Sequence, residues 1–185
     1  VYAHHLENGS PRMQYRQRLR EIIAERHHDV AVYTTDHCQI EPQCDNPQIL
    51  FEMNSNGSIW FPVHNKYYNG TVFSAYIETL TKGPARGLTE KTWDPIQKGH
   101  FVLPFGYCGI VKDCAGYGIE LPDFIDYGYD SINNHLQRWD AYINELDRLC
   151  GLNRTKWRNL YQGARSLLIK NRQCLENHHP ERLID

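Results

Sequence analysis

Three charged side chains of this chain have the types and the placement needed to hold a phosphorylated ligand. Glu78 follows the apolar segment 71–77, which is typical of a buried strand, and Glu90 and Lys91 follow Thr89, which is typical of a helix N-cap. A carboxylate such as Glu90 accepts hydrogen bonds from sugar hydroxyls, and Lys91 can neutralise a diphosphate leaving group. Because Glu is also routine in the first turn of a helix, the chemistry depends on where the fold places these residues.

The elements around these residues alternate between strands and helices, which predicts a parallel sheet covered by helices on both faces. The segments 30–34, 72–77 and 101–105 are short apolar runs, and we expect them to be adjacent strands in the centre of the sheet. Ligands bind outside the carboxyl ends of such strands, and helix N-termini at that edge attract phosphate. The sequence therefore predicts that a ligand site lies where Glu78 and the helix start at Thr89 meet.

The remaining segments complete a single Rossmann-like α/β domain over residues 1–176, followed by a loose tail at 177–185. Ser10 and Pro11 predict the start of an amphipathic helix that ends near His28. Further predicted elements are a loop at 36–47, strands at 49–53 and 59–63, a helix at 110–115, a last short strand and loop at 118–126, and two C-terminal helices at 131–149 and 154–175.

The composition of the chain argues against several classes of function. A chain of 185 residues with 41% hydrophobic residues is long enough for one domain with a sizeable core. Its net charge of -2 and the lack of a long basic run argue against nucleic acid as a partner, and no apolar stretch is long enough for a membrane span. Six widely spaced cysteines favour reduced thiols and, slightly, the cytoplasm. Four N-glycosylation sequons, at Asn8, Asn56, Asn69 and Asn153, favour the secretory route instead, so the compartment stays open.

Several standard catalytic signatures are missing from the sequence. It contains no G-x-G-x-x-G or Walker-type loop, no G-x-S-x-G elbow and no H-E-x-x-H motif. It also contains no D-x-D motif, the usual sign of a sugar nucleotide held by a metal. We therefore expect chemistry without a metal ion.

The stretch from 71 to 138 resembles the donor-binding domain of GT-B-type glycosyltransferases, namely the fucosyltransferase-like and related phage or viral enzymes. The shared features are a Glu at a strand end, a Thr-Glu-Lys helix start, an apolar strand with a following Gly, a Gly-rich aromatic segment, a Tyr-Asp pair and a helix that bears an Arg. In this sequence they correspond to Glu78, Thr89-Glu90-Lys91, 101–106, Gly116-Tyr117-Gly118, Tyr129-Asp130 and Arg138.

The resemblance implies a nucleotide diphosphate sugar as the donor substrate, with no separate cofactor. It implies that the donor is bound by Glu78, Thr89, Glu90 and Lys91. It further implies that an Arg before the apolar stripe of the first helix contacts the diphosphate; Arg16 fits best, and Arg12 is the alternative. We expect these groups to converge on one cleft at the carboxyl edge of the sheet.

Two departures from the family pattern limit what the resemblance implies. A complete GT-B enzyme has two Rossmann-like domains, and this chain has room for one, so a second domain or subunit is expected as a partner. The acidic pair that precedes Tyr-Asp in the phage-type sequences is Tyr127-Gly128 here. The general base usually comes from the other domain, so none is assigned; Asp36 and His37 follow the strand at 30–34 but have no further support.

The sequence thus predicts a glycosyltransferase, or its donor-binding half, that transfers a hexose or fucose to a hydroxyl of a glycan, a protein or another acceptor. The alternative is a non-catalytic binding or assembly module that keeps the same fold. DNA modification by such an enzyme would differ only in the acceptor, and the near-neutral charge gives it no support.

Overall fold

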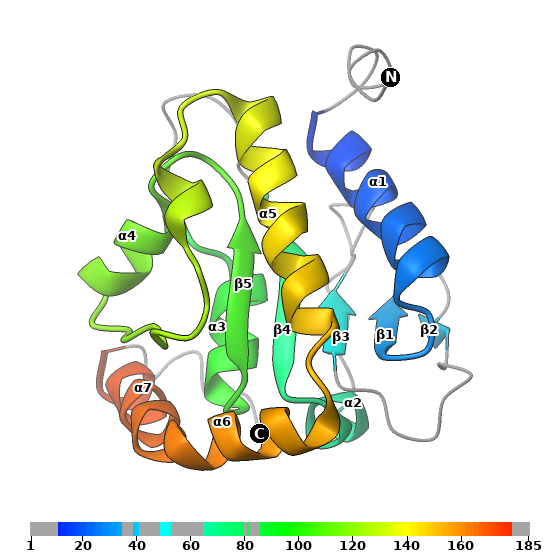
Figure 1. The fold of residues 1–185 in the computed structure, drawn as a ribbon. Coiled ribbons are helices and arrows are strands. Elements are labelled where there is room, and N and C mark those ends of the chain that lie inside the picture. Colours follow the sequence, from blue (N-terminus) through cyan, green and yellow to red (C-terminus); the bar gives the residue numbers. More distant parts are fainter. Residues whose placement is uncertain are drawn as a thin grey trace.

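A computed structural model describes residues 11–34, 39–40, 49–52, 65–79, 81 and 86–178 of the protein. They form a mixed structure of helices and strands, as predicted (Figure 1). The helices are α1 (Pro11–Arg26), α2 (Asn65–Gly70), α3 (Glu90–Gln97), α4 (Ile110–Gly116), α5 (His135–Cys150), α6 (Arg154–Gly163) and α7 (Arg165–His178), with a 3₁₀ helix η2 (Gly128–Ser131). The strands are β1 (Ala31–Thr34), β2 (Gln39–Ile40), β3 (Ile49–Glu52), β4 (Phe73–Ile77) and β5 (Phe101–Phe105). The predicted strand at 59–63 lies outside the described residues.

The strands of the described residues form one sheet in the order β2-β1-β3-β4-β5. The pairs β1–β3, β3–β4 and β4–β5 are parallel, and the short β2 pairs antiparallel with β1. The predicted neighbourhood of the three apolar strands is wrong in two respects, because β3 separates β1 from β4, and β5 lies at an edge. An apolar run shows that a strand is covered on both faces, but it carries no information on which strand lies beside it.

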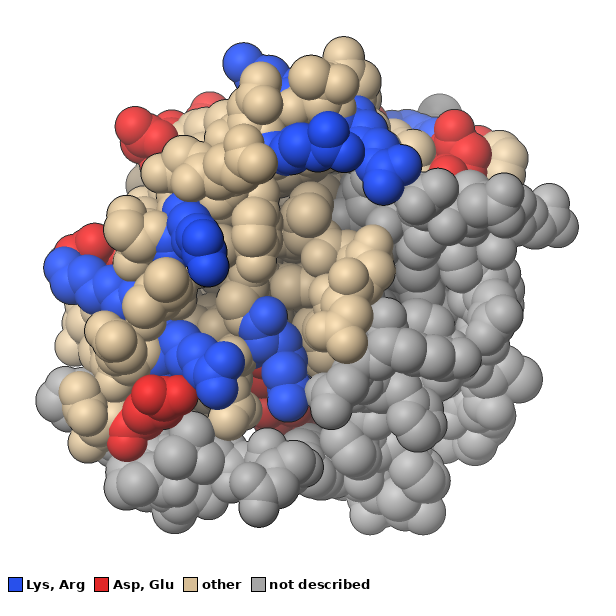
Figure 2. All heavy atoms as spheres, turned by 90° about the horizontal axis from the view of Figure 1, so that it is seen from below, with Lys and Arg blue, Asp and Glu red and all other residues tan. Residues whose placement is uncertain are grey.

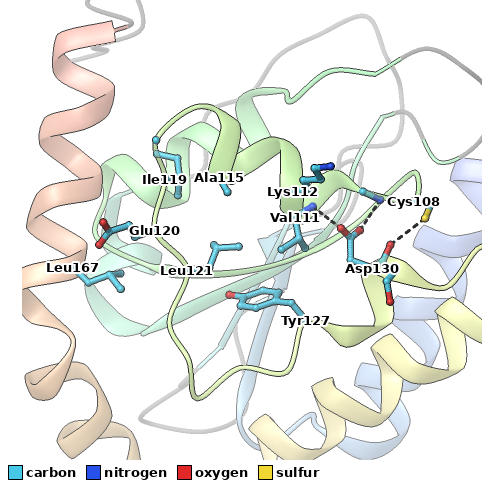
Figure 3. Close-up of a pocket in the computed structure, with 13 residues that line it drawn as sticks. Cys108, Val111, Lys112, Ala115, Ile119, Glu120, Leu121, Tyr127, Asp130 and Leu167 are labelled. Carbon is cyan, nitrogen blue, oxygen red and sulfur yellow. Dashed lines mark hydrogen bonds between the residues drawn. The ribbon is translucent and has the colours of Figure 1, made fainter.

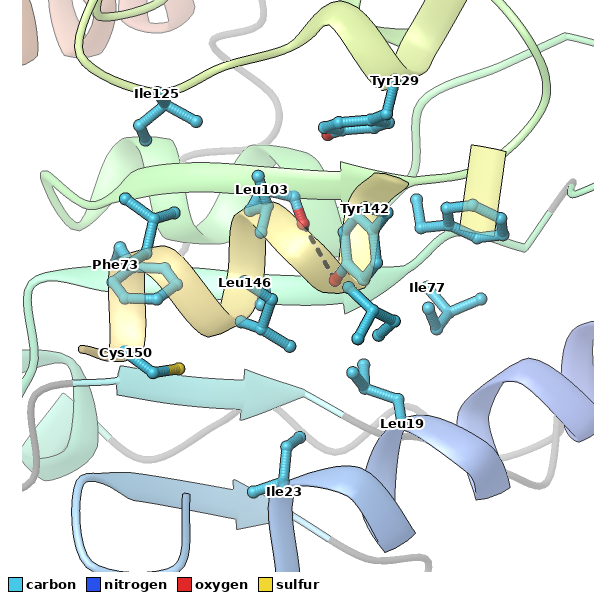
Figure 4. Close-up of a cluster of buried hydrophobic side chains, with 14 of the residues drawn as sticks. Leu19, Ile23, Phe73, Ile77, Leu103, Ile125, Tyr129, Tyr142, Leu146 and Cys150 are labelled. Carbon is cyan, nitrogen blue, oxygen red and sulfur yellow. Dashed lines mark hydrogen bonds between the residues drawn. The ribbon is translucent and has the colours of Figure 1, made fainter. Parts of the chain in front are cut away.

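Alternate residues of β4 and β5 face two separate hydrophobic clusters, because successive side chains of a strand point to opposite faces. Phe73, Ala75 and Ile77 of β4 pack with residues of α1, α5 and α6, and Tyr76 packs with residues of α3 and α4 on the other face. The larger cluster is rich in aromatic rings, including Tyr142, whose hydroxyl donates to the carbonyl of Leu103 (Figure 4). Strands β4 and β5 are thus buried on both sides, as their apolar sequences predicted.

Among the described residues no further strand pairs with the outer edge of β5, and tyrosine hydroxyls close this edge. The hydroxyl of Tyr127 donates to the carbonyl of Val102 at 2.8 Å, and that of Tyr129 donates to the carbonyl of Pro104 at 2.7 Å. Pro104 has no N–H to leave unpaired, which suits an edge strand. The predicted strand within 118–126 is therefore wrong: this segment is irregular, and it leads to η2, which carries Tyr129 across the edge.

We expect Tyr129→Phe to lower the free energy of unfolding by about 1–2 kcal/mol, because the buried carbonyl of Pro104 would lose its donor. Urea unfolding of the parent and the variant measures this difference. Tyr161→Phe is the matched control, since the Tyr161 hydroxyl makes no hydrogen bond within the described residues. Equal losses in the two variants would show that the hydroxyl of Tyr129 does not support the edge.

The carboxyl-terminal helices differ from the predicted ones in their bounds. Helix α5 begins at His135 and not at 131, because the Asn134 side chain accepts hydrogen bonds from two backbone N–H groups of the first turn. The predicted helix at 154–175 is divided at Ala164 into α6 and α7. The division lets Trp157 enter the cluster on one face of the sheet and Leu175 enter the cluster on the other face.

Among the described residues, no helix combines the length and apolar character needed to cross a membrane.

Candidate functional site

Glu78 lies directly after β4, fully buried, with four protein donors around its carboxylate. One oxygen accepts from the backbone N–H of Thr89 at 2.9 Å and from the Thr92 hydroxyl at 2.8 Å. The other oxygen accepts from the backbone N–H of Thr79 at 2.8 Å and from the Thr89 hydroxyl at 2.7 Å. The hydroxyl of Tyr76 in turn donates to that of Thr92 at 2.8 Å. These bonds fix the first turn of α3 against the carboxyl end of β4.

The four donors use the acceptor capacity of the Glu78 carboxylate, since each oxygen offers about two lone-pair sites. In this arrangement Glu78 positions the helix start and leaves no acceptor free for a ligand. The sequence correctly indicated a carboxylate at this strand end. It predicted, however, that this carboxylate binds the nucleotide sugar. Its bonds to Thr89 and Thr92 explain why two threonines flank the charged pair of residues at the beginning of α3.

Glu90 and Lys91 occupy the first turn that Glu78 holds in place. The Lys91 side chain is only 7% exposed, and its ammonium group forms an ion pair with the half-buried carboxylate of Glu90. Burial alone would raise the pKa of Glu90, but the hydrogen bond and the charge of Lys91 outweigh it, so that the pKa is lowered. Lys91 is therefore a nearly buried cation at the N-terminus of a helix, where the helix dipole favours anions.

Arg16 is the cation that α1 contributes to the same edge of the sheet. Its side chain is buried, and its guanidinium donates to the carbonyl of Ile77 at 3.3 Å. Because Ile77 immediately precedes Glu78, the structure brings Arg16 close to the Glu78 network. The alternative, Arg12, lies in the first turn of α1, and its side chain is outside the described residues, as are Asp36 and His37.

A second carboxylate network lies after β5, and the sequence did not predict its role. The carboxylate of Asp130 accepts from the backbone N–H groups of Gly109, Ile110 and Val111 at 2.9–3.2 Å. Gly109 has a φ of 95°, which a residue with a Cβ rarely adopts. Burial raises the pKa of Asp130 more than these N–H bonds lower it. The N-terminus of α4 is therefore already occupied by an anion from the protein.

Arg138 links the start of α5 to the end of β5. This buried guanidinium donates to the carbonyls of Ile132 at 2.7 Å and of Gly106 at 3.2 Å, and it lies 5.7 Å from the centre of the Phe105 ring. Within the described residues it makes no ion pair. The Tyr-Asp pair and this Arg are two of the features that carry the family resemblance. Both thus bind backbone groups near the end of β5.

A cavity of about 770 Å³ lies beside α4 (Figure 3). Cys108 and Asp130 line its end at the carboxyl edge, while Val111, Tyr127 and Leu167 line its apolar part. None of the predicted site residues Arg16, Glu78, Thr89, Glu90 and Lys91 lines it. Glu78, Arg16 and the start of α3 lie near one another at the carboxyl edge of the sheet, but they do not line this cavity.

The cysteines of the described residues are all free thiols. They are Cys108, Cys114, Cys150 and Cys174. Burial raises the pKa of the Cys114 thiol to about 12, so this side chain behaves as a small apolar core residue and not as a nucleophile. Cys38 and Cys44 lie outside the described residues.

Comparisons of the chain with protein-family models, with curated protein sequences and with solved structures gave no match. The motif at 71–138 and the geometry of the carboxyl edge are therefore the features that bear on function.

Proposed function

We propose that this chain is the Rossmann-like donor-binding part of a metal-independent glycosyltransferase that takes a nucleotide diphosphate sugar. The observation that carries the proposal is the first turn of α3, which the buried Glu78 holds at the carboxyl edge of a mostly parallel sheet. Carboxyl edges are where ligands bind in open sheets of this kind. The Thr89-Glu90-Lys91 motif, which carries the family resemblance, lies at this position.

The charges at this edge suit the two halves of such a donor. Lys91 and Arg16 are cations held by the fold with little exposure, and they suit the diphosphate. Glu90 is a half-buried carboxylate with a lowered pKa, so it is ionised at neutral pH and can accept hydrogen bonds from ribose or hexose hydroxyls. A diphosphate would compete with Glu90 for Lys91, which frees the carboxylate for those hydroxyls.

The transfer itself requires two further groups. A base must deprotonate the acceptor hydroxyl, and negative charge must be neutralised on the departing nucleoside diphosphate. Lys91 supplies the second requirement in this proposal. The base is expected from a second domain or subunit that faces the carboxyl edge.

We expect Lys91→Ala to weaken the binding of uridine or guanosine diphosphate about tenfold or more, because one charge-assisted contact of about 1.4 kcal/mol is lost. The fold should persist, since the ammonium group opposes the dipole of α3 by roughly 0.3–1 kcal/mol. Isothermal titration calorimetry of parent and variant measures the affinities. Lys98→Ala, at the other end of the same helix, is the control and should bind as the parent does. The donor-site proposal fails if neither nucleotide binds the parent, or if Lys91→Ala binds both unchanged.

A further inference from the structure

The segment 151–175 carries six basic residues and no acidic one, although the whole chain has a net charge of -2. The six are Arg154, Lys156, Arg158, Arg165, Lys170 and Arg172, and all are exposed on α6 and α7. Lys170 pairs with Glu120 and Arg172 pairs with Glu176. The other four make no ion pair within the described residues. Figure 2 shows Lys and Arg side chains spread over this underside, with few carboxylates among them.

This basic face lies at the opposite end of the strands from the proposed donor site. Trp157 of α6 stacks on Phe73, the first residue of β4, with ring centroids 5.0 Å apart. Helices α6 and α7 therefore run across the amino edge of the sheet, at the bottom of Figure 1. Glu78 and the start of α3 lie at the carboxyl edge. A partner on the basic face would leave the carboxyl edge uncovered.

One large hydrophobic side chain is exposed among these charges. Ile169 is 48% exposed, and it lies on α7 four residues after Arg165 and three residues before Arg172, so the three share one side of the helix. A surface with this composition matches the boundary between headgroups and acyl chains, where cations contact phosphate and aliphatic side chains enter the apolar layer. A nucleic acid backbone also offers phosphates, but it has no apolar layer that the Ile169 side chain could enter.

We propose that the α6–α7 face docks on a membrane surface that contains anionic phospholipids. Attraction of the four unpaired cations to the lipid phosphates supplies the affinity, and Ile169 adds contact with the apolar layer. Each Lys or Arg near such a surface contributes about a fivefold gain in affinity. The proposal does not depend on the donor site, because none of its residues belongs to the α3 region.

Co-sedimentation of the full chain with lipid vesicles tests this proposal. We expect binding to phosphatidylcholine vesicles that contain about 30% phosphatidylserine at about 0.15 M salt, none to pure phosphatidylcholine vesicles, and loss of binding at about 1 M salt, where charges are screened within about 3 Å. At about 0.15 M salt, Arg154→Gln combined with Arg158→Gln should weaken binding about 25-fold, and Ile169→Ser should weaken it severalfold.

The matched control removes two exposed cations elsewhere, by Arg20→Gln on α1 and Lys112→Gln on α4. It should bind vesicles as the parent does. Circular dichroism and nucleotide titration of every variant separate loss of docking from loss of the fold or of the donor site. The proposal is overturned if the parent does not bind anionic vesicles, or if the control loses as much affinity as the α6 double variant. It is also overturned if duplex DNA binds the parent more tightly than the vesicles do at the same salt concentration.

Discussion

Replacement of Glu78 by Ala should lower the free energy of unfolding by about 3–5 kcal/mol. The change removes a fully buried acceptor of four hydrogen bonds. The hydroxyls of Thr89 and Thr92 can turn toward other partners, but the backbone N–H groups of Thr79 and Thr89 cannot. An unpaired buried donor costs about 1–3 kcal/mol, so the two backbone groups account for most of the loss.

Two further variants identify the origin of this loss. Glu78→Gln keeps the shape and one carbonyl oxygen, so only one of the two backbone N–H groups, that of Thr79 or that of Thr89, loses its acceptor, and we expect a loss of about 1–2 kcal/mol. Glu90→Gln keeps the shape of a neighbouring, partly exposed side chain and an oxygen that accepts from Lys91, and it should cost about 1 kcal/mol or less. Urea unfolding of the three variants orders them. A loss below about 1 kcal/mol for Glu78→Ala would show that the network does not hold α3 in place.

The parts of the site that could be predicted from the sequence depend on local signals. An apolar run followed by Glu78 is recognisable as a strand end, and a threonine before Glu90 is recognisable as a helix cap, whatever the rest of the chain does. The helix begins at Glu90, as those signals indicated. The position of Glu90 and Lys91 at the beginning of α3 therefore followed from the sequence.

The parts that could not be predicted depend on contacts between distant segments. Asp130 binds N–H groups about 20 residues earlier in the chain, and Arg138 binds a carbonyl 32 residues earlier. Nothing in the local pattern of η2 shows that its carboxylate meets the start of α4. The predicted order of the strands failed for the same reason, because it depends on pairing between strands that are distant in the sequence. Glu78 was placed correctly at the strand end, but its four donors come together only when the start of α3 lies against the end of β4.

Acidification should destabilise the protein through His100, which is buried at the amino edge of the sheet. Its Nε2 lies 2.9 Å from the carbonyl of Tyr68, and its Nδ1 lies 3.0 Å from the hydroxyl of Ser74. A neutral ring satisfies both partners by donating to the carbonyl and accepting from the hydroxyl. Burial lowers the pKa of His100 to about 4, although the bond to the Tyr68 carbonyl opposes this shift.

The sign of the effect follows from which state binds the proton first. The unfolded chain takes it up near the ordinary pKa of 6.5, whereas the folded protein does so only near 4. The stabilisation is therefore complete above pH 6.5, falls as the pH drops from 6.5 to 4, and changes no further below that. Each unit of pKa difference corresponds to 1.36 kcal/mol, so His100 should account for a loss of about 3 kcal/mol across this window.

Urea unfolding of the parent and of His100→Gln between about pH 7 and pH 4 measures this contribution. The variant should be less stable than the parent at neutral pH, and the difference between the two should shrink as the pH falls, because Gln binds no proton in either state. His28→Gln, the same replacement at a histidine that is exposed on the turn after α1, is the control. The pKa shifts of Glu90 and Asp130 are present in the parent and in His100→Gln alike, so their effects on stability cancel in the comparison. A constant difference between His100→Gln and the parent at every pH would mean that His100 is not held neutral in the folded state.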